Sequence, residues 1–392
     1  MRIVILGGAG TIGRVIALDL VQDVPEVVIA DRDLEAASTT ARRVGKGAIP
    51  AGVDVTDRKA LRSLLQGADA CINSVNYYFN LDVMDACREV GVPYLDLGGL
   101  FHVTRRQLEL HEAFRQAGVT AVLGLGSCPG VANVHAGWLG AMLDTVEYVR
   151  IYNGSTQDEG ESLAAPYAIE TILDEISKPA MVFRGGSFVE MPPVSEEEYY
   201  LFPEPIGWAK THLSLHSEVA TIPLSLADKG IQECFFKITF FGYSEMALRK
   251  LQFLAEAGLA DAGPIEVDGS AVRPRQVLLK LLEKVPQTSQ KPVSQGFKDV
   301  ATEVKGTKDG KQVTLRADTT GWPHPEWGVS GGTLLVGVPP AVLARWMADG
   351  RLTRPGVWAP EQVVDPIPFF DELALRGFTT TLTRTETVAA PS

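Results

Sequence analysis

The amino-acid sequence predicts an α/β protein in which a doubly wound parallel sheet is followed by a second, α+β domain with a mixed or antiparallel sheet. Up to Leu125, short apolar segments alternate with segments of helical period. From Val146 onward the apolar runs lengthen and alternate with polar residues, as in strands with one solvated face. A glycine-rich turn follows the first apolar segment. These three observations support the fold class.

The strands expected in the first domain are almost wholly apolar, which is typical of a parallel sheet with helices on both faces. They span Arg2–Leu6, Val27–Ala30, Ala51–Val55, Ala70–Asn73, Tyr94–Leu97 and Thr120–Leu123. The helices between them are expected at Ile12–Val21, Leu34–Val44, Arg58–Leu65, Leu81–Val90 and Gln107–Ala117. Gly91 and Gly118 follow two of these helices, and we expect them to cap the C-termini.

The second domain is expected to combine longer strands with a few helices. The strands are Val146–Tyr152, Glu233–Phe241, Val300–Lys305 and Gln312–Ala317, and the helices are Leu163–Ile176 and Ser244–Glu256. Lys308-Asp309-Gly310 predicts a tight turn between the last two strands, and Met191–Pro205 predicts a surface loop.

The chain after Gly328 again has the pattern of α/β packing, with helices expected at Pro339–Asp349 and Asp371–Arg376. We therefore divide the chain into a first domain (residues 1–130), a second domain (131–327), and a C-terminal segment (328–392) that returns to the first domain.

The composition indicates an ordinary globular protein: 392 residues, 45% hydrophobic and 21% charged. A net charge of −12 argues against nucleic acid and anionic membranes as partners. Thr120–Leu143 contains no charged residue, but glycines, a proline and polar residues interrupt it, so we interpret it as a buried strand, turn and helix. We expect a cytoplasmic protein without a signal peptide, because strand-forming sequence begins at Arg2.

The cysteine and histidine patterns predict no metal site. The four cysteines are scattered without a CxxC pair, which is typical of reduced thiols. His212 and His216 have the i, i+4 spacing of a helical metal pair, but no glutamate follows His212 as in zinc proteases.

The glycine-rich turn has the spacing of a dinucleotide-binding fingerprint. Gly8, Gly10 and Gly13 follow the first strand, and Asp31 ends the second strand about twenty residues later. The glycines allow the sharp turn, the approach of the pyrophosphate and close packing of the helix. Asp31 can bind the ribose hydroxyls and repel a 2′-phosphate, which favours NAD, while Arg32 keeps NADP possible. The first domain is therefore predicted to be of the Rossmann type.

Further cofactor contacts are expected where the other strands end, since ligands of such sheets bind outside the carboxyl ends of the strands. Backbone amides of the first helical turn face the pyrophosphate, polar residues after the third strand lie near the adenine, and the ends of the fourth and sixth strands lie near the nicotinamide ribose and ring. These residues are Thr11, Ile12, Asp54, Val55, Asn73, Ser74, Val75, Ser127 and Pro129.

Three residues are candidates for catalysis. Asp96 ends the fifth strand before two glycines, so it either points into the cleft or caps a turn. Tyr77 either lines the nicotinamide site or packs in the core. His216 has Glu218 two residues away and is either a proton acceptor for an amine or a structural histidine. We interpret Cys128 as a packing residue.

Several segments together resemble the saccharopine dehydrogenase (saccharopine reductase) family, and within it the lysine 6-dehydrogenases. They are the GxGxxG start, Asp96–Gly99, Gly124–Asn133, the His-Ser-Glu run at His216, Leu108–Glu112, Lys178–Ala180, Lys308–Lys311 and Thr353–Val357. The resemblance implies that residues 1–130 form a dinucleotide-binding domain for NAD(P), that residues 131–327 form a mixed α/β domain for substrate binding and dimerisation, and that the protein is a homodimer. It also implies cofactor contacts at the glycine loop, Asp31, Asn73 and the Ser127–Asn133 loop, with Asp96 and His216 near the substrate.

The resemblance further implies hydride transfer from the CH–NH or CH–NH2 group of an amino acid to the nicotinamide, giving an imine that water hydrolyses. A substrate carboxylate needs a cation, for which Arg150, Arg184 and Arg249 are candidates. Two alternatives stay open, namely a non-catalytic NAD(P)-binding regulator and an enzyme that works reductively on another amine. Short-chain reductases and epimerases are disfavoured, because no tyrosine here has a lysine four residues later.

Overall fold

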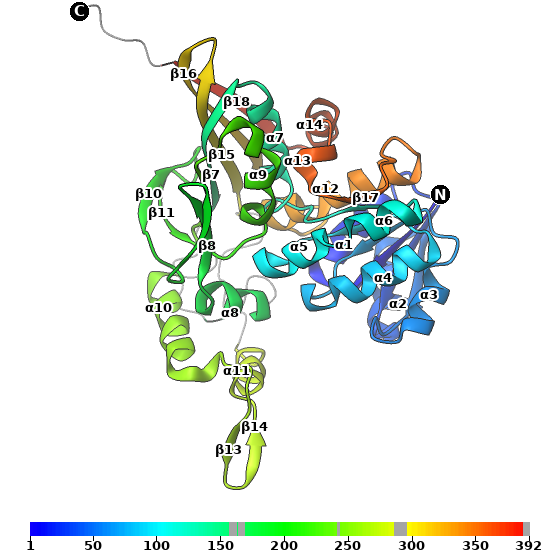
Figure 1. Ribbon diagram of the computed structural model, residues 1–392. Helices are drawn as coiled ribbons and strands as arrows, with labels where there is room; N and C mark the ends of the chain where they lie inside the picture. The colour runs from blue at the N-terminus through cyan, green and yellow to red at the C-terminus, as the bar shows by residue number, and fades with distance from the viewer. Residues whose placement is uncertain (157–162, 164–168, 241–243, 286–295, 387–392) are drawn as a thin grey trace, which may run out of the picture.

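The computed structural model describes residues 1–156, 163, 169–240, 244–285 and 296–386. Figure 1 shows two lobes, one built on a parallel sheet and one on a larger mixed sheet, and the C-terminal part of the chain contributes a strand to each. The predicted fold class is confirmed.

The parallel sheet has seven strands in the order β17-β6-β5-β4-β1-β2-β3. Their bounds are β1 Arg2–Leu6, β2 Glu26–Asp31, β3 Ala48–Gly52, β4 Ala70–Asn73, β5 Tyr94–Asp96, β6 Thr120–Val122 and β17 Gly356–Trp358. The strand order reverses between β1 and β4, so their carboxyl ends form the switch point where such sheets bind ligands.

Helices cover both faces of this sheet, as the apolar strands predict. They are α1 Thr11–Leu20, α2 Leu34–Val44, α3 Arg58–Leu65, α4 Asn80–Val90, α5 Leu100–Leu108 and α6 His111–Ala117. Alternate residues of β1 belong to different cores, Ile3 and Ile5 to one and Val4 and Leu6 to the other. Gly91 and Gly118 end α4 and α6 at φ 76° and 71°, which confirms the predicted C-caps.

Two element predictions in this domain are wrong in their bounds. The helix expected at Gln107–Ala117 is two helices, because buried Gln107 is held near the end of α5 and the chain turns at Leu110 before α6 begins. The third strand ends at Gly52 rather than Val55. It is an edge strand, where Pro50 costs no ladder hydrogen bond, and it therefore begins earlier than predicted.

The second sheet has nine strands, seven of them in the order β10-β11-β12-β7-β15-β16-β18, with β8 and β9 attached through β12. The bounds are β7 Thr145–Ser155, β8 Ala180–Arg184, β9 Ser187–Met191, β10 Glu198–Leu201, β11 Trp208–Leu213, β12 Glu233–Ile238, β15 Lys298–Lys308, β16 Lys311–Gly321 and β18 Thr379–Glu386. Only β7 and β12 pair in parallel among these strands, so the sheet is mixed. The turn at Lys308-Asp309-Gly310 is confirmed.

Five longer helices accompany this sheet: α7 Val131–Ala141, α8 Ile169–Ser177, α9 Glu218–Ser225, α10 Glu245–Leu254 and α11 Pro274–Leu282. The predicted loop at Met191–Pro205 is wrong in part, because Glu198–Leu201 pairs with β11 as an edge strand. Of the helix expected at Leu163–Ile176, residues 164–168 lie outside the described residues, as does Phe241 of the expected strand. Thr120–Leu143 forms β6, a turn and α7, as predicted.

The chain after Gly328 contributes to both lobes. Helix α12 (Gly331–Ala348) packs on α1, and β17 extends the parallel sheet, whereas β18 pairs with β16 in the mixed sheet. The predicted return to the first domain is therefore observed, but the chain then leaves that domain again to add β18 to the mixed sheet. Two further helices, α13 (Pro360–Val363) and α14 (Pro366–Ala374), connect β17 to β18.

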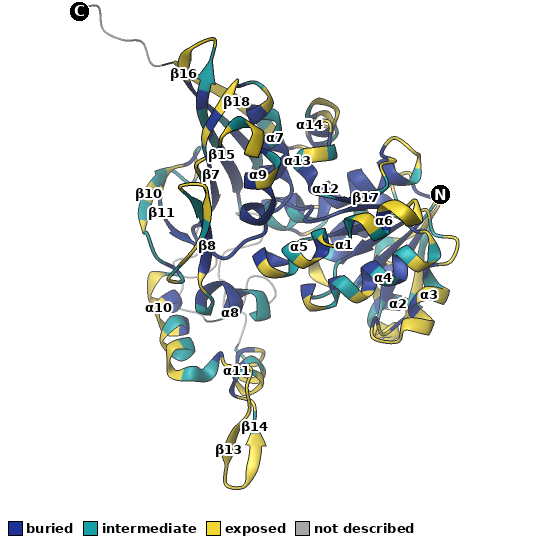
Figure 2. Ribbon diagram, viewed as in Figure 1, coloured by how far each residue is buried: buried dark blue, intermediate teal, exposed yellow. Residues whose placement is uncertain are grey.

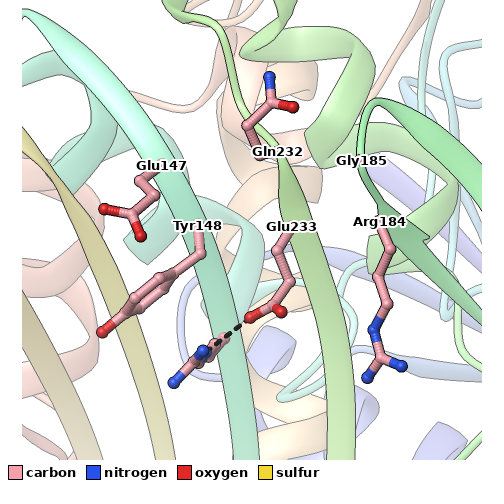
Figure 3. Close-up of a pocket in the computed structure, with 7 residues that line it drawn as sticks. Glu147, Tyr148, Arg184, Gly185, Gln232 and Glu233 are labelled. Carbon is pink, nitrogen blue, oxygen red and sulfur yellow. Dashed lines mark hydrogen bonds and ion pairs between the residues drawn. The ribbon is translucent and has the colours of Figure 1, made fainter.

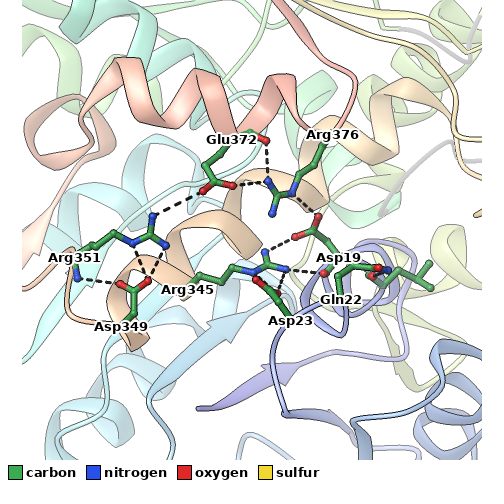
Figure 4. Close-up of polar contacts among 9 residues, drawn as sticks. Asp19, Gln22, Asp23, Arg345, Asp349, Arg351, Glu372 and Arg376 are labelled. Atoms are coloured by element: carbon green, nitrogen blue, oxygen red, sulfur yellow. Dashed lines mark hydrogen bonds and ion pairs between the residues drawn. The ribbon is translucent and has the colours of Figure 1, made fainter.

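Figure 4 shows how α12 is held to α1. The Arg345 guanidinium pairs with the buried Asp19 carboxylate, and Arg376 Nε lies 2.6 Å from the other oxygen of Asp19. Helix α12 also approaches α1 closely, because a Cβ on Gly337 would lie 2.6 Å from Val15. These contacts dock the C-terminal helix against the helix that begins at the glycine loop.

A hairpin of two short strands, β13 (Ile265–Val267) and β14 (Ser270–Val272), projects from the second lobe and is almost wholly exposed (Figure 2). Within the described ranges, no helix is long and apolar enough to cross a membrane.

Candidate active site

The turn between β1 and α1 is shaped to admit a dinucleotide. A Cβ on Gly13 would lie 2.3 Å from the carbonyl oxygen of Gly7, so the helix packs directly on the turn. Gly10 precedes the first helical residue, and no side chain caps the first turn of α1. Gly8 and Gly10 thus form a cradle without side chains next to the helix N-terminus at Thr11 and Ile12, which suits a pyrophosphate. The geometry fits NAD(P).

Asp31 lies beside this cradle. Its carboxylate accepts hydrogen bonds from the backbone N–H of Ala9 at 3.3 Å and of Asp33 at 3.2 Å, while Arg32 is exposed. The loop with Asp54 and Val55 also lies at this edge, because Val53 N–H donates to the carbonyl oxygen of Asp31. Hydrogen bonds from Thr56 lower the pKa of the exposed Asp54 carboxyl.

The loop after β4 closes against the glycine turn. A Cβ on Gly7 would lie 2.8 Å from the carbonyl oxygen of Ser74 and 3.1 Å from Val75. Asn73 points inward: its amide donates to Asn80 at 2.9 Å, and its oxygen accepts from Val75 N–H at 3.4 Å. Asn73 therefore shapes the loop in this structure.

Asp96 does not face an open cleft, contrary to one of the two predictions made for it. Its buried carboxylate accepts five hydrogen bonds, from the backbone N–H of Gly98 and Gly124 and from the side chains of Asn80, Tyr94 and Gln107. Burial raises the pKa of Asp96. With its oxygens occupied in this way, Asp96 ties the ends of β5 and β6 together.

The loop from Gly124 to Asn133 packs tightly over this edge. The positions where Gly98 and Gly124 would carry a Cβ each lie 2.8 Å from the ring of Pro129, and Ser127 is buried. Asn133 holds the loop by accepting from Gly130 N–H at 3.0 Å. Burial, followed by the charge of Glu218, raises the pKa of Cys128 well above its usual value, consistent with a packing thiol.

The second lobe brings His216 to the same edge. Ser217 accepts a hydrogen bond from the backbone N–H of Gly99 at 3.2 Å and donates to the carbonyl oxygen of Leu100 at 3.3 Å. These contacts join the His-Ser-Glu run to the loop after β5. The predicted residues of the first and second domains are therefore brought together at the carboxyl edge of the parallel sheet.

His216 is buried and oriented. Its ring stacks on Phe236 with centroids 3.9 Å apart, and Nδ1 donates to the carboxylate of Glu218. Burial alone would lower the pKa of His216, but the charge and hydrogen bond of Glu218, with the charge of Glu175, raise it above its usual value. Among the described residues Nε2 has no hydrogen-bond partner, so it is the nitrogen available to a substrate.

Two buried charged residues near His216 were missed by the sequence reasoning. Glu175 on α8 and Lys298 on β15 both influence the charge state of the imidazole. The sequence could have indicated that Lys298 is buried, because it alternates along β15 with Val300 and Val304, which both face the core. Glu175 offered no comparable signal, since its burial depends on the packing of distant elements.

Tyr77 lies in a contact between the lobes. Its hydroxyl donates to Asp174 on α8, which also accepts from Tyr78 at 2.5 Å and lies 2.9 Å from Arg275. Burial, with the hydrogen bond to Asp174, raises the pKa of Tyr77 far above its usual value. In this arrangement the hydroxyl is engaged and holds η1 (Tyr77–Phe79) against the second lobe.

Each of the three predicted arginine anchors is paired with a carboxylate in this structure. Arg150 lies 2.8 Å from Glu233, Arg184 forms two hydrogen bonds with Glu196, and Arg249 lies 2.7 Å from Glu245. Arg150 and Arg184 line a pocket of about 310 Å³ between β7, β12 and the β8–β9 turn (Figure 3). Arg150 and Ile151 project from opposite faces of β7. Ile151 pairs with Phe236, on which His216 stacks, so His216 lies on the face of the sheet opposite Arg150.

In the described part of the chain, no three histidine, cysteine or acidic residues are grouped so that they could hold a metal ion.

Comparison with known proteins covers nearly the whole chain. The saccharopine dehydrogenase NADP binding domain matches residues 3–122, and the saccharopine dehydrogenase C-terminal domain matches residues 126–378. A carboxyaminopropylagmatine dehydrogenase of Synechocystis sp. is 27% identical over 96% of each chain, and a carboxynorspermidine synthase of Vibrio cholerae is 26% identical over 94% of each.

Among solved structures, saccharopine dehydrogenase (L-Glu forming) from Saccharomyces cerevisiae superimposes with a TM-score of 0.72 over 98% of this chain and 99% of that one. At 17% identity, this likeness shows the fold. With both parts of the sequence and the fold in agreement, the chain belongs to the saccharopine dehydrogenase family of NAD(P)-binding oxidoreductases.

Proposed function

We propose that this protein is an NAD(P)-dependent oxidoreductase that acts at the CH–NH group of an amine carrying a carboxylate, with a carboxylated polyamine as the preferred class. The names of both relatives describe carboxyl-bearing polyamines. The relatives favour this class over lysine, the substrate that the resemblance to lysine 6-dehydrogenases suggests. The single observation that carries a catalytic role is the buried His216–Glu218 pair, placed beside the carboxyl edge of the nucleotide-binding sheet.

The residues of the first domain hold the cofactor in this proposal. The amides at Gly10, Thr11 and Ile12 bind the pyrophosphate, and Asp31 binds the adenosine ribose. The loop containing Ser127 and Pro129 covers the nicotinamide end. NAD(P), when bound, supplies the hydride acceptor or donor.

His216 carries the proton. In the oxidative direction Nε2 takes a proton from the substrate nitrogen, because only an unprotonated amine can form a C=N bond as hydride leaves. In the reductive direction the imidazolium returns that proton to the nitrogen. Glu218 fixes the ring through Nδ1 and stabilises the imidazolium, and stacking on Phe236 limits rotation of the ring.

A substrate panel tests this proposal. Purified protein is mixed with NAD or NADP and with carboxynorspermidine, saccharopine, lysine or norspermidine, and the absorbance of the reduced cofactor is followed. We expect the fastest reduction with carboxynorspermidine and only background rates from His216→Asn. Tight nucleotide binding without turnover on any amine would contradict the proposal and favour a regulator.

A further inference from the structure

Lys298 is a charged residue buried in the interior of the second lobe. Its side chain is 1% exposed and lies at the start of β15, opposite Gly321 of β16 and Ser155 of β7. Thr302, which has the same parity on β15, pairs with Ile151 of β7, and the β12 partner of Ile151 is Phe236, on which His216 stacks. Lys298 therefore projects from the face of the mixed sheet that carries His216.

Contacts of α12 place Lys298 near the nucleotide-binding edge. A Cβ on Gly332 would lie 3.8 Å from Cδ of Lys298. One turn further along α12, Val336 lies 3.4 Å from the position of a Cβ on Gly126, in the loop that packs over the ends of β5 and β6. The lysine and this loop are thus adjacent along a single helix.

Several other ionisable groups lie near Lys298. The ammonium of Lys298 interacts electrostatically with Cys128 from the loop, Asp299 from the same strand and Glu175 from α8. The charges of Lys298 and Glu175 both affect the pKa of His216. Burial lowers the pKa of Lys298 to about 8, which leaves the side chain charged at neutral pH. A site with two buried glutamates and a buried lysine complements a ligand that has both amines and a carboxylate.

From this placement we infer that Lys298 binds the carboxylate of the substrate and so selects carboxylated amines over plain ones. The inference rests on the proposed function.

The test uses two ligands that differ only by the carboxylate, carboxynorspermidine and norspermidine, in calorimetric titrations of the NAD(P)-loaded protein. The wild type is expected to bind carboxynorspermidine roughly 10- to 100-fold more tightly than norspermidine. Lys298→Met should lose most of this ratio while its affinity for norspermidine and for NAD(P) changes little. Lys298→Arg should keep the ratio.

Lys237→Met is the matched control. Lys237 is also buried, at 5% exposure, but it lies on the opposite face of the same sheet and pairs with Glu198 at 2.7 Å. We expect this variant to keep the preference for carboxynorspermidine. Circular dichroism and NAD(P) affinity establish that each variant is folded.

A pH series adds a second readout. The preference of the wild type should weaken as the pH rises above about 8, where Lys298 loses its charge, and the preference of Lys298→Arg should persist. A Lys298→Met variant that retains the full preference would overturn this inference but leave the proposed function standing. A wild type that neither binds nor oxidises any amine of the panel would overturn both.

Discussion

Glu218 controls the acidity of His216 in this structure. The carboxylate is fully buried and bonded to Nδ1, while the other ring nitrogen stays available to a ligand. Since the resulting pKa of His216 lies above its usual value, the imidazole is protonated over more of the neutral range than a free histidine. Oxidation needs the neutral ring, so its rate should rise with pH up to that raised pKa.

Replacing the negatively charged Glu218 tests whether this carboxylate raises the pKa of His216. Glu218→Gln should lower the pKa of His216 and move the rising limb of the oxidative pH–rate profile to lower pH. His216→Asn should remove the limb and reduce turnover by about 10²- to 10⁴-fold, as expected for a lost general base. The measurement is kcat/KM against pH. A limb that stays in place in Glu218→Gln would exclude His216 as the titrating group.

Asp31 is predicted to determine the choice between NAD and NADP. We expect the wild type to prefer NAD, because the carboxylate next to the glycine turn repels a 2′-phosphate. Asp31→Asn removes that repulsion and should shift the ratio of affinities about 10-fold toward NADP. Glu35→Gln, which removes one exposed negative charge from the first turn of α2, should leave the ratio unchanged. A wild type that prefers NADP would refute this role of Asp31.

Local sequence pattern explains why the glycine turn could be predicted, whereas the orientation of Asp96 could be predicted only in part. Gly8, Gly13 and Asp31 belong to one continuous strand–turn–helix–strand unit, whose geometry depends on neighbours in sequence. The orientation of Asp96 depends on Gln107 and Gly124, which reach it only after α5 and β6 have packed. Lys298 and Glu175 meet His216 through the second sheet and α8, which no local pattern specifies.

At the scale of elements, the sequence predicts those with strong periodicity and misses those defined by tertiary pairing. Strand β1 and helices α2 and α3 have the predicted bounds. Strand β10 was expected to be loop, because its polar, aromatic sequence becomes a strand only when β11 offers a partner. The start of α12 was placed too late, since Pro339 and Pro340 lie inside the helix rather than near its start.

The docking of α12 on α1 gives a prediction about stability. Asp19 is 4% exposed and accepts from both Arg345 and Arg376, so Asp19→Ala removes the buried carboxylate that the two guanidinium groups share and leaves them only their more exposed partners. The free energy of unfolding should fall by about 3–5 kcal/mol. Asp23→Ala removes a partner of Arg345 that is 61% exposed and should cost about 0–1 kcal/mol. Urea unfolding of both variants checks this, and equal losses would contradict it.

At the scale of the whole molecule, the resemblance to the family predicts a homodimer. The projecting β13–β14 hairpin is consistent with this, because Ile265 is 53% exposed and an isolated two-stranded hairpin is marginally stable. We expect light scattering to give twice the chain mass of 42.3 kDa. Ile265→Asp should weaken the dimer without loss of NAD(P) binding. A monomeric wild type would refute this prediction.

In the proposed active site, both lobes are required. The first supplies the nucleotide cradle, and the second supplies His216, Glu218 and Lys298 at the carboxyl edge of the parallel sheet. The contacts of Ser217 with Gly99 and of Tyr77 with Asp174 join the lobes on either side of this edge.

A crystal structure of the protein with NAD(P) and carboxynorspermidine tests the central claim most directly. The account predicts the pyrophosphate at the N–H groups of Gly10 and Thr11, the substrate nitrogen within hydrogen-bond distance of His216 Nε2, and its carboxylate on Lys298. Nucleotide bound away from the glycine turn, or a substrate amine remote from His216, would contradict it.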